Sequence, residues 1–248
     1  MSKIPEDLFP KDERIFLSSV YEKITNAENK GFPAFCDFCR DTEMAFLKGL
    51  LSSVGGFGFV SKIKDAERQI PAVNYEYASV PTDIILFEGI SGSDVSHRDI
   101  LGSLMNLGIK RQKIGDILTD ERVFAEVKSE ITPYILSTLG KIRNRNVNPV
   151  IYDGEVVKTF RFEECFYTVS SLRADCIVGA VLKMSRETAK NTVLSGQLLI
   201  NSLPMEKPDE ILKENDVMTV KGSGKFIFSE ILGNTKKDRV KILIKKYI

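Results

Sequence analysis

Basic side chains stand at the starts of two short helices that the sequence predicts in its last third. Arg173 falls in the first turn of the first helix. Arg186 and Lys190, four residues apart, share an exposed face of the second helix, which Ser185 is expected to cap. Helix N-termini carry partial positive charge and free N–H groups, so cations there do not stabilise the helix but add to its attraction for phosphate. We therefore interpret these residues as a surface for an external polyanion, an interpretation that fails if both arginines turn inward, each neutralised by a nearby carboxylate.

A second set of cations flanks a helix predicted from residue 96 to residue 107. Ser96 and Asp99 form an S-x-x-D version of the capping box at its start. The basic residues near its two ends are His97, Arg98, Lys110, Arg111 and Lys113. A single local carboxylate opposes them, so the sequence indicates a positively charged patch suited to a phosphate backbone. A capped helix with solvated lysines explains the same residues, and by themselves they favour that simpler explanation.

Two further lysines, Lys221 and Lys225, flank Gly222 and Gly224 in a strand near the C-terminus. The Gly-x-Gly-Lys sequence lacks the spacing of a phosphate-binding loop, and Phe226 stands where such a loop has Ser or Thr. We therefore count the lysines as candidate polyanion contacts and not as part of a nucleotide site.

Residues for catalysis or metal binding are few. Cys36-x-x-Cys39 is half of a zinc site at most, because Cys165 and Cys176 lack ligand spacing and His97 is the only histidine. The phenylalanines beside the first pair favour buried thiols. One histidine permits few catalytic triads, and no paired carboxylates suggest hydrolysis. The sequence predicts no catalytic residues, no metal and no cofactor.

The charge is distributed unevenly along the 248 residues. The chain has 35 Lys and Arg against 34 Asp and Glu, yet from Thr168 onward there are 14 against 9. A basic tail on a mildly acidic body suggests a polyanionic partner, although a lysine-rich solvated surface explains it equally well. No apolar run is long enough to span a membrane, and four irregularly spaced cysteines indicate a reducing compartment. We expect a cytoplasmic protein without a membrane partner.

Hydrophobic periodicity predicts an α+β protein in three parts. Residues 1–55 are expected to form a helical segment, with Gly31 ending the first helix and Thr42 capping the second. Residues 56–165 mix strands with two helices and predict an α/β, sandwich-like domain with helices on one sheet face.

The third part, residues 168–248, holds the two basic helices and a β extension. Ser171 is expected to cap the first of these helices, and Asp175 to form a cap or an ion pair within the domain. The stretch before it, ending in "FRFEECFYTVSS", predicts an edge strand or connector.

The third part resembles the S4 RNA-binding domain. The residues that carry this resemblance are Leu172-Arg173-x-Asp175, Met184-Ser185-Arg186-x-x-Ala189, Val193-x-x-Gly196-x-x-x-Ile200-Asn201 and Asp216-x-Met218-x-Val220. The resemblance implies that the helix pair and the adjoining strand face RNA. The chain departs from the family at Gln197, Leu199, Leu203 and Ser223, where cations or an aromatic residue are usual, which implies fewer phosphate contacts.

A second resemblance covers nearly the whole chain. "SHRDILGSLMNLGIKRQKIGDIL", "VKGSGKF" and "GNTKKDRVKILI" are similar to segments of the YlmH family of bacterial S4-domain RNA-binding proteins. This implies a non-enzymatic, monomeric protein that binds structured ribosomal RNA, tRNA or both on the large ribosomal subunit, in rescue or quality control of stalled translation. Two alternatives stay open: an RNA-modifying enzyme such as a pseudouridine synthase-like protein, and a cell-division adaptor protein.

Overall fold

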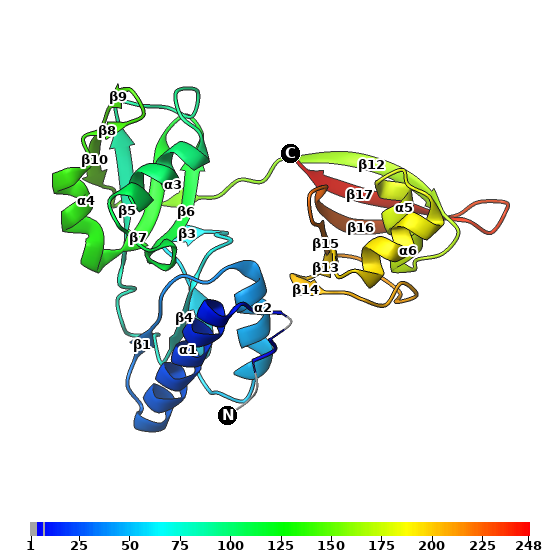
Figure 1. The fold of residues 1–248 in the computed structure, drawn as a ribbon, viewed down its shortest axis with the longest axis horizontal. Coiled ribbons are helices and arrows are strands. Elements are labelled where there is room, and N and C mark those ends of the chain that lie inside the picture. Colours follow the sequence, from blue (N-terminus) through cyan, green and yellow to red (C-terminus); the bar gives the residue numbers. More distant parts are fainter. Residues whose placement is uncertain (1–3, 7) are drawn as a thin grey trace. The chain divides into compact units, whose positions relative to one another are not determined.

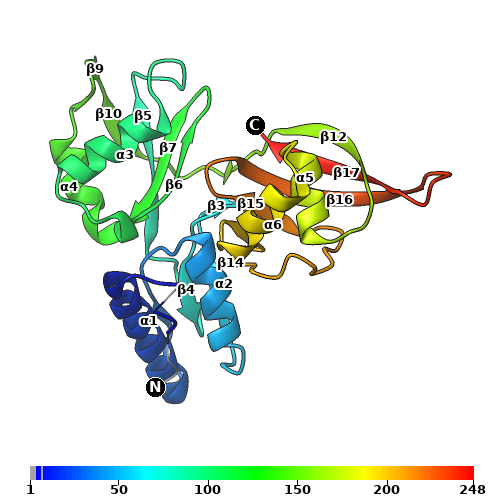
Figure 2. The same cartoon turned by 45° about the vertical axis from the view of Figure 1, so that its right-hand side comes forward.

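The chain divides into two compact units, the first ending at Thr159 and the second beginning at Phe160. The structure is a computed structural model that describes residues 4–6 and 8–248 (Figure 1, Figure 2). None of the helices in this described part has both the length and the apolar character that a bilayer crossing requires. Helices and strands are mixed in both units, which confirms the predicted α+β class.

The N-terminal helices rest on a small sheet. The elements are α1 (Lys11–Lys30), α2 (Asp41–Leu50), β1 (Ala34–Phe35), β2 (Phe57–Val60) and β4 (Ile70–Val73), with the strands in the order β1-β4-β2. Leu17 and Ile24 of α1 share a core with Leu47 of α2 and Val73 of β4, so this packing extends beyond the helical segment predicted over residues 1–55.

The sequence predicted the residue that ends α1 and the residue that caps α2. Gly31 ends α1 in the left-handed conformation, as predicted. The predicted cap at Thr42 is wrong, because α2 begins at Asp41 and Arg40 is its N-cap residue. Glu43, the third residue of α2, accepts a hydrogen bond from the Arg40 backbone N–H at 2.7 Å, as in a capping box.

A four-stranded antiparallel sheet forms the centre of the first unit. Its strands are β5 (Thr82–Glu88), β6 (Ile114–Thr119), β7 (Val123–Lys128) and β10 (Asn148–Ile151), in the order β10-β5-β7-β6. The predicted central strand is therefore β5, and the predicted hairpin is the β6–β7 pair, both confirmed.

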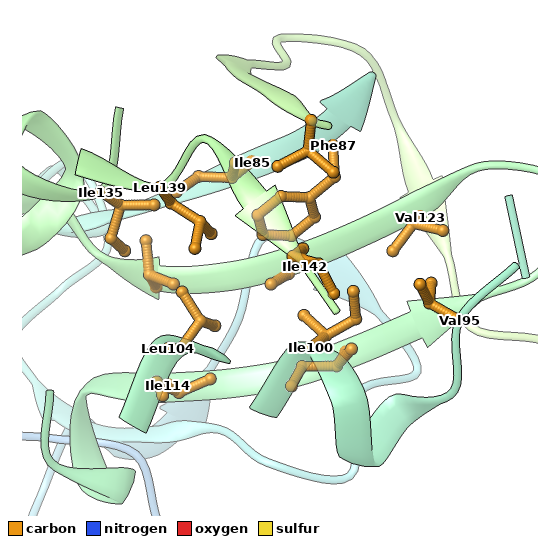
Figure 3. Packing of buried hydrophobic residues seen from close by; sticks show 14 of the residues in the cluster. Ile85, Phe87, Val95, Ile100, Leu104, Ile114, Val123, Ile135, Leu139 and Ile142 are labelled. Carbon is orange, nitrogen blue, oxygen red and sulfur yellow. The ribbon is translucent and has the colours of Figure 1, made fainter. Parts of the chain in front are cut away.

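Two helices, α3 (His97–Asn106) and α4 (Thr132–Thr138), cover one face of this sheet. Figure 3 shows Ile100 and Leu104 of α3 and Ile135 of α4 packed together with Ile85 and Phe87 of β5. The placement of helices on one face follows the sequence expectation. The short elements that complete the unit are β3 (Ile63–Lys64), β8 (Lys141–Ile142), β9 (Arg145–Asn146), β11 (Val156–Val157) and the 3₁₀ turns η1 (Arg111–Lys113) and η2 (Ser129–Ile131).

The second unit is a six-stranded antiparallel sheet with two helices. The strands are β12 (Phe162–Val169), β13 (Leu198–Ile200), β14 (Leu203–Pro204), β15 (Val217–Val220), β16 (Gly224–Asn234) and β17 (Val240–Tyr247), in the order β12-β17-β16-β15-β13-β14. The helices are α5 (Ala174–Val181) and α6 (Arg186–Leu194). Ile177 of α5 and Val193 of α6 share a core with Phe228 and Ile244 of the sheet.

This unit begins before the predicted start of the last domain at residue 168, because β12 is its edge strand, as the sequence allowed. The predicted cap at Ser171 is wrong: α5 begins at Ala174 and Arg173 is the N-cap residue. The helix pair and the strand after it occur where the resemblance implies them, while the S4 assignment stays a prediction.

A buried carboxylate secures the sheet face that α3 and α4 leave open. Glu126 of β7 is 0 % exposed, and its oxygens accept hydrogen bonds from the Lys62 backbone N–H at 2.8 Å, from Thr82 Oγ1 at 2.7 Å and from Ser61 Oγ. The nearby strands β3 and β11 pair with each other, and their Ile63 and Val156 cover apolar residues of the same face. Glu126 therefore holds the segment at residues 61–62 against the sheet.

We expect Glu126→Ala to lower the free energy of unfolding by about 3 kcal/mol, because it leaves several buried donors without an acceptor. The matched control is Glu121→Ala, which removes the same charge from an exposed turn position and should change that free energy by no more than about 0.5 kcal/mol. Urea unfolding followed by circular dichroism measures both. Equal stability of the two variants would show that the hydrogen bonds to Glu126 contribute little.

Candidate nucleic-acid interface

The capping box at the start of α3 is confirmed. Asp99 Oδ2 accepts hydrogen bonds from the Ser96 backbone N–H at 2.9 Å and from Ser96 Oγ at 2.7 Å, while Ser96 Oγ accepts from the Asp99 N–H. These bonds from Ser96 hold the pKa of Asp99 below its usual value. The capping box thus satisfies the backbone N–H groups of Ser96 and Asp99 from within the fold.

A hairpin brings further arginines to this helix start. The β8–β9 hairpin places Arg143 3.5 Å from Asp99 and Arg145 2.9 Å from Asp94. The side chains of Arg143 and Arg145 remain 61 % and 57 % exposed, and Arg98 in the first turn of α3 is exposed as well. Lys141 lies exposed on the same hairpin. The sequence did not predict the hairpin residues as site residues, although "KIRNRN" combines three cations with turn-forming asparagines.

The structure divides the five cations predicted around α3. Arg98, Lys110 and His97 are exposed. Although the His97 side chain reaches solvent, desolvation by neighbouring atoms and the charge of Arg111 lower its pKa below the ordinary value, so the neutral ring predominates at pH 7. The net positive charge expected here therefore comes from the other residues.

Arg111 and Lys113 have partners within the fold. The Arg111 guanidinium donates to the backbone oxygens of Ile114 and Gly115, and burial lowers its pKa to about 10. Lys113 Nζ lies 2.8 Å from Asp37 and 2.6 Å from Glu130. Burial opposes the charge of Lys113, yet the hydrogen bonds to these carboxylates raise its pKa. Both side chains therefore support the local structure and are not the freely solvated cations that the simpler explanation expected.

Asp175 forms an ion pair with Arg173, one of the two roles that the sequence predicted for Asp175. Arg173 Nε lies 3.0 Å from Asp175 Oδ1, and its terminal nitrogen lies 2.9 Å from Oδ2, a bidentate pair. Asp175 is 1 % exposed. Its burial alone would raise its pKa, but the bonds from Arg173 and Cys176 outweigh burial and lower it. Arg173 thus has a carboxylate partner within its own domain, and its contact with RNA stays a prediction.

Arg186 and Lys190 face outward. Arg186 Nε lies 3.9 Å from Asp175 Oδ2, and the side chain is 73 % exposed. Lys190, one turn further along α6, is exposed too. Both arginines therefore lie within ion-pair distance of Asp175, Arg173 closely and Arg186 loosely with most of its side chain exposed. The polyanion interpretation of α6 stays a prediction.

The remaining predicted contacts take different positions. Ser185 caps α6, because its Oγ accepts a hydrogen bond from the Thr188 N–H at 3.1 Å, as expected. Lys221 is exposed at the turn between β15 and β16. Lys225 is half-buried, with Nζ 5.0 Å from the centre of the Tyr247 ring, a cation–π contact.

The two thiols of the Cys36-x-x-Cys39 motif are buried and not bonded to each other. Cys36 and Cys39 lie in the core of the N-terminal helices, and all four cysteines are free. Burial raises the pKa of Cys36 to about 11 and that of Cys39 well above its usual value. In the part of the chain that is described, His, Cys, Asp and Glu side chains form no group of three or more that suits a metal ion.

The thiols allow a direct chemical test. A pKa of about 11 leaves about one Cys36 in 1,000 as thiolate at pH 8, so we expect iodoacetamide to modify native protein at Cys165 or Cys176 long before Cys36 or Cys39. In urea all four should react. Peptide mass spectrometry identifies the modified sites, and rapid native modification at Cys36 would show an accessible, reactive pair.

The Arg173–Asp175 pair predicts a pH dependence. A carboxyl whose pKa is lowered in the folded state stabilises the fold above its unfolded pKa of about 4 and loses this effect as the pH falls through the folded pKa. We expect Asp175→Asn to cost about 2 kcal/mol at pH 7 and progressively less below about pH 4. Urea unfolding between pH 7 and pH 3 measures the difference, with Glu210→Gln as an exposed control. A cost independent of pH would contradict the assignment of the pKa shift to this pair.

Comparison with known proteins finds a family model that matches the arginine-bearing region. Residues 92–151 match the family described as a putative RNA-binding domain in YlmH. Over 256 aligned residues the chain is 26% identical to the ribosome-associated protein quality control protein P2 of Bacillus subtilis (strain 168), covering 96% of each chain. The solved structure of cell division protein ylmH from Streptococcus pneumoniae has 24% identity and a TM-score of 0.46, over 58% of this chain and 93% of that one. The matches in sequence confirm the predicted resemblance to the YlmH family.

Proposed function

We propose that the protein is a non-enzymatic RNA-binding protein that recognises structured RNA on the large ribosomal subunit, ribosomal RNA with or without tRNA. In this proposal it acts as a cytoplasmic monomer in rescue or quality control of stalled translation. The observation that carries the proposal is the exposed arginine cluster at the start of α3, formed by Arg98, Arg143 and Arg145 within the matched region 92–151.

The arginine cluster suits phosphate better than it suits its own carboxylates. Exposed ion pairs such as Arg143–Asp99 and Arg145–Asp94 contribute little because solvent screens them, so an RNA phosphate competes easily for these guanidinium groups. Arginine binds phosphate through two parallel hydrogen bonds, which gives orientation as well as attraction. Recognition by this cluster follows the shape and phosphate positions of a folded RNA, with little reading of bases.

The second unit adds a further cationic surface. Arg186 and Lys190 project from α6, and Ser185 fixes the start of that helix. Lys221 extends the exposed cations of this unit to the turn after β15. Because the charge from Thr168 onward is positive overall, this unit attracts RNA through its general field as well as through individual contacts.

A translation role is supported by the relative that aligns along almost the whole chain. The B. subtilis protein carries ribosome-associated quality control in its name, and 96% of both chains align. An enzymatic role has less support from the geometry. Glu126 and Asp116, the buried acidic residues of the central sheet, each accept several hydrogen bonds from the fold, so neither oxygen pair is open to act as a general base.

Sedimentation of tagged protein through a sucrose gradient of cell lysate tests the proposal. We expect co-migration with large ribosomal subunits at low salt that is lost at high salt, because phosphate contacts release counterions. Arg143→Gln/Arg145→Gln should shift protein to the top of the gradient at lower salt than wild type. The matched control is Lys30→Gln/Lys48→Gln, which removes two exposed cations from the N-terminal helices and should behave as wild type.

Each other outcome counts against the proposal. A wild-type peak only at the monomer position contradicts ribosome association. Equal loss of binding in both double variants contradicts the role of the arginine cluster and leaves only a general charge effect. Modified nucleosides formed in ribosomal RNA by the purified protein would show an enzyme.

A further inference from the structure

The hairpin of β16 and β17 ends in a cationic loop. Its turn has the sequence Thr235-Lys236-Lys237-Asp238-Arg239, in which Asp238 is the one carboxylate. Lys236, Lys237 and Arg239 are all exposed. In both ribbon views the loop projects beyond the sheet of its own unit (Figure 1, Figure 2). Its lysines are thus presented where a large partner meets no steric obstacle from the sheet.

The loop is held in one shape by its own hydrogen bonds. Thr235 Oγ1 accepts from the backbone N–H groups of Lys237 and Arg239 at 3.4 Å and 3.1 Å, and the Thr235 N–H donates to the Arg239 oxygen at 2.7 Å. The Arg239 guanidinium donates to the Thr168 oxygen of β12 at 2.9 Å, which ties the loop to the neighbouring strand. Such a loop loses little conformational entropy when it binds.

The loop and the basic start of α6 border the same surface depression. A shallow depression of about 270 Å³ lies between them, and Arg239 from the loop and Arg186 from α6 both line it. Cys176 and Gly179 of α5 form part of its lining, with Asp175 beside them. Because Asp175 is already engaged by Arg173, it opposes the two lining arginines only partly.

We propose that this loop is a second phosphate-binding element, in which Lys236, Lys237 and Arg239 contact the backbone of the same folded RNA that lies on α6. The proposal rests on the RNA-binding function proposed above and deepens it by adding a contact that the sequence resemblance did not assign. The RNA runs from Lys190 and Arg186 across the depression to the loop, and it is held by charge and not by base identity.

The test measures the salt dependence of binding for the full chain, using filter binding to purified large-subunit ribosomal RNA. Lys236→Gln/Lys237→Gln should weaken binding. It should also make the slope of log affinity against log salt concentration less negative by about 1.4 to 1.8, the change for two lost phosphate contacts. The matched control is Lys207→Gln/Lys213→Gln, which removes two exposed lysines from the acidic segment of the same unit and should keep the wild-type slope.

The outcomes separate the two proposals. Wild-type binding with equal slopes for the loop variant and its control overturns the loop inference and leaves the proposed function standing. Wild-type protein that is folded by circular dichroism but binds no RNA overturns the proposed function itself. Because the substituted lysines are exposed, unchanged thermal unfolding is expected, and it excludes misfolding as the cause of weaker binding.

Discussion

Buried carboxylates on one face of the central sheet hold the first unit together. Glu126 receives donors from residues 61, 62 and 82, and Asp116 receives the backbone N–H groups of Glu67 and Arg68 at 2.9 Å and 3.0 Å. The segment between the N-terminal helices and β5 is therefore fastened to strands β6 and β7. With that face covered, α3 and α4 are free to occupy the opposite face, and the start of α3 stays at the surface.

Pairing within the fold decides which cations are available to a partner. Lys113 and Arg173 are each held by carboxylates, and Arg111 is held by backbone oxygens. The exposed cations that we propose as contacts lie on a hairpin, on one face of a helix or in a loop. A count of Lys and Arg along the sequence therefore overstates the charge that RNA meets.

Local signals in the sequence predicted the elements well, and non-local contacts limited the prediction of the site. The capping box of Ser96 and Asp99 and the β6–β7 hairpin depend on residues a few positions apart, so both were predictable. The approach of Arg143 to Asp99 depends on a hairpin folded back over 44 positions, which no local pattern encodes. The Arg173–Asp175 pair joins residues only two positions apart, yet it was also hard to predict. The burial of Asp175, which depends on the rest of the domain, holds the carboxylate in place for both hydrogen bonds.

The strand order of the second unit has a consequence for its assembly. β17 comes last along the chain yet lies inside the sheet, paired on one side with β16 and on the other with β12 over eight residues. Until β17 is inserted, β12 has no neighbour and both flanking strands expose unpaired backbone groups that invite aggregation. A chain interrupted shortly before residue 240 would thus keep both helices of this unit and leave the edges of β12 and β16 without a partner strand, prone to pair with other chains.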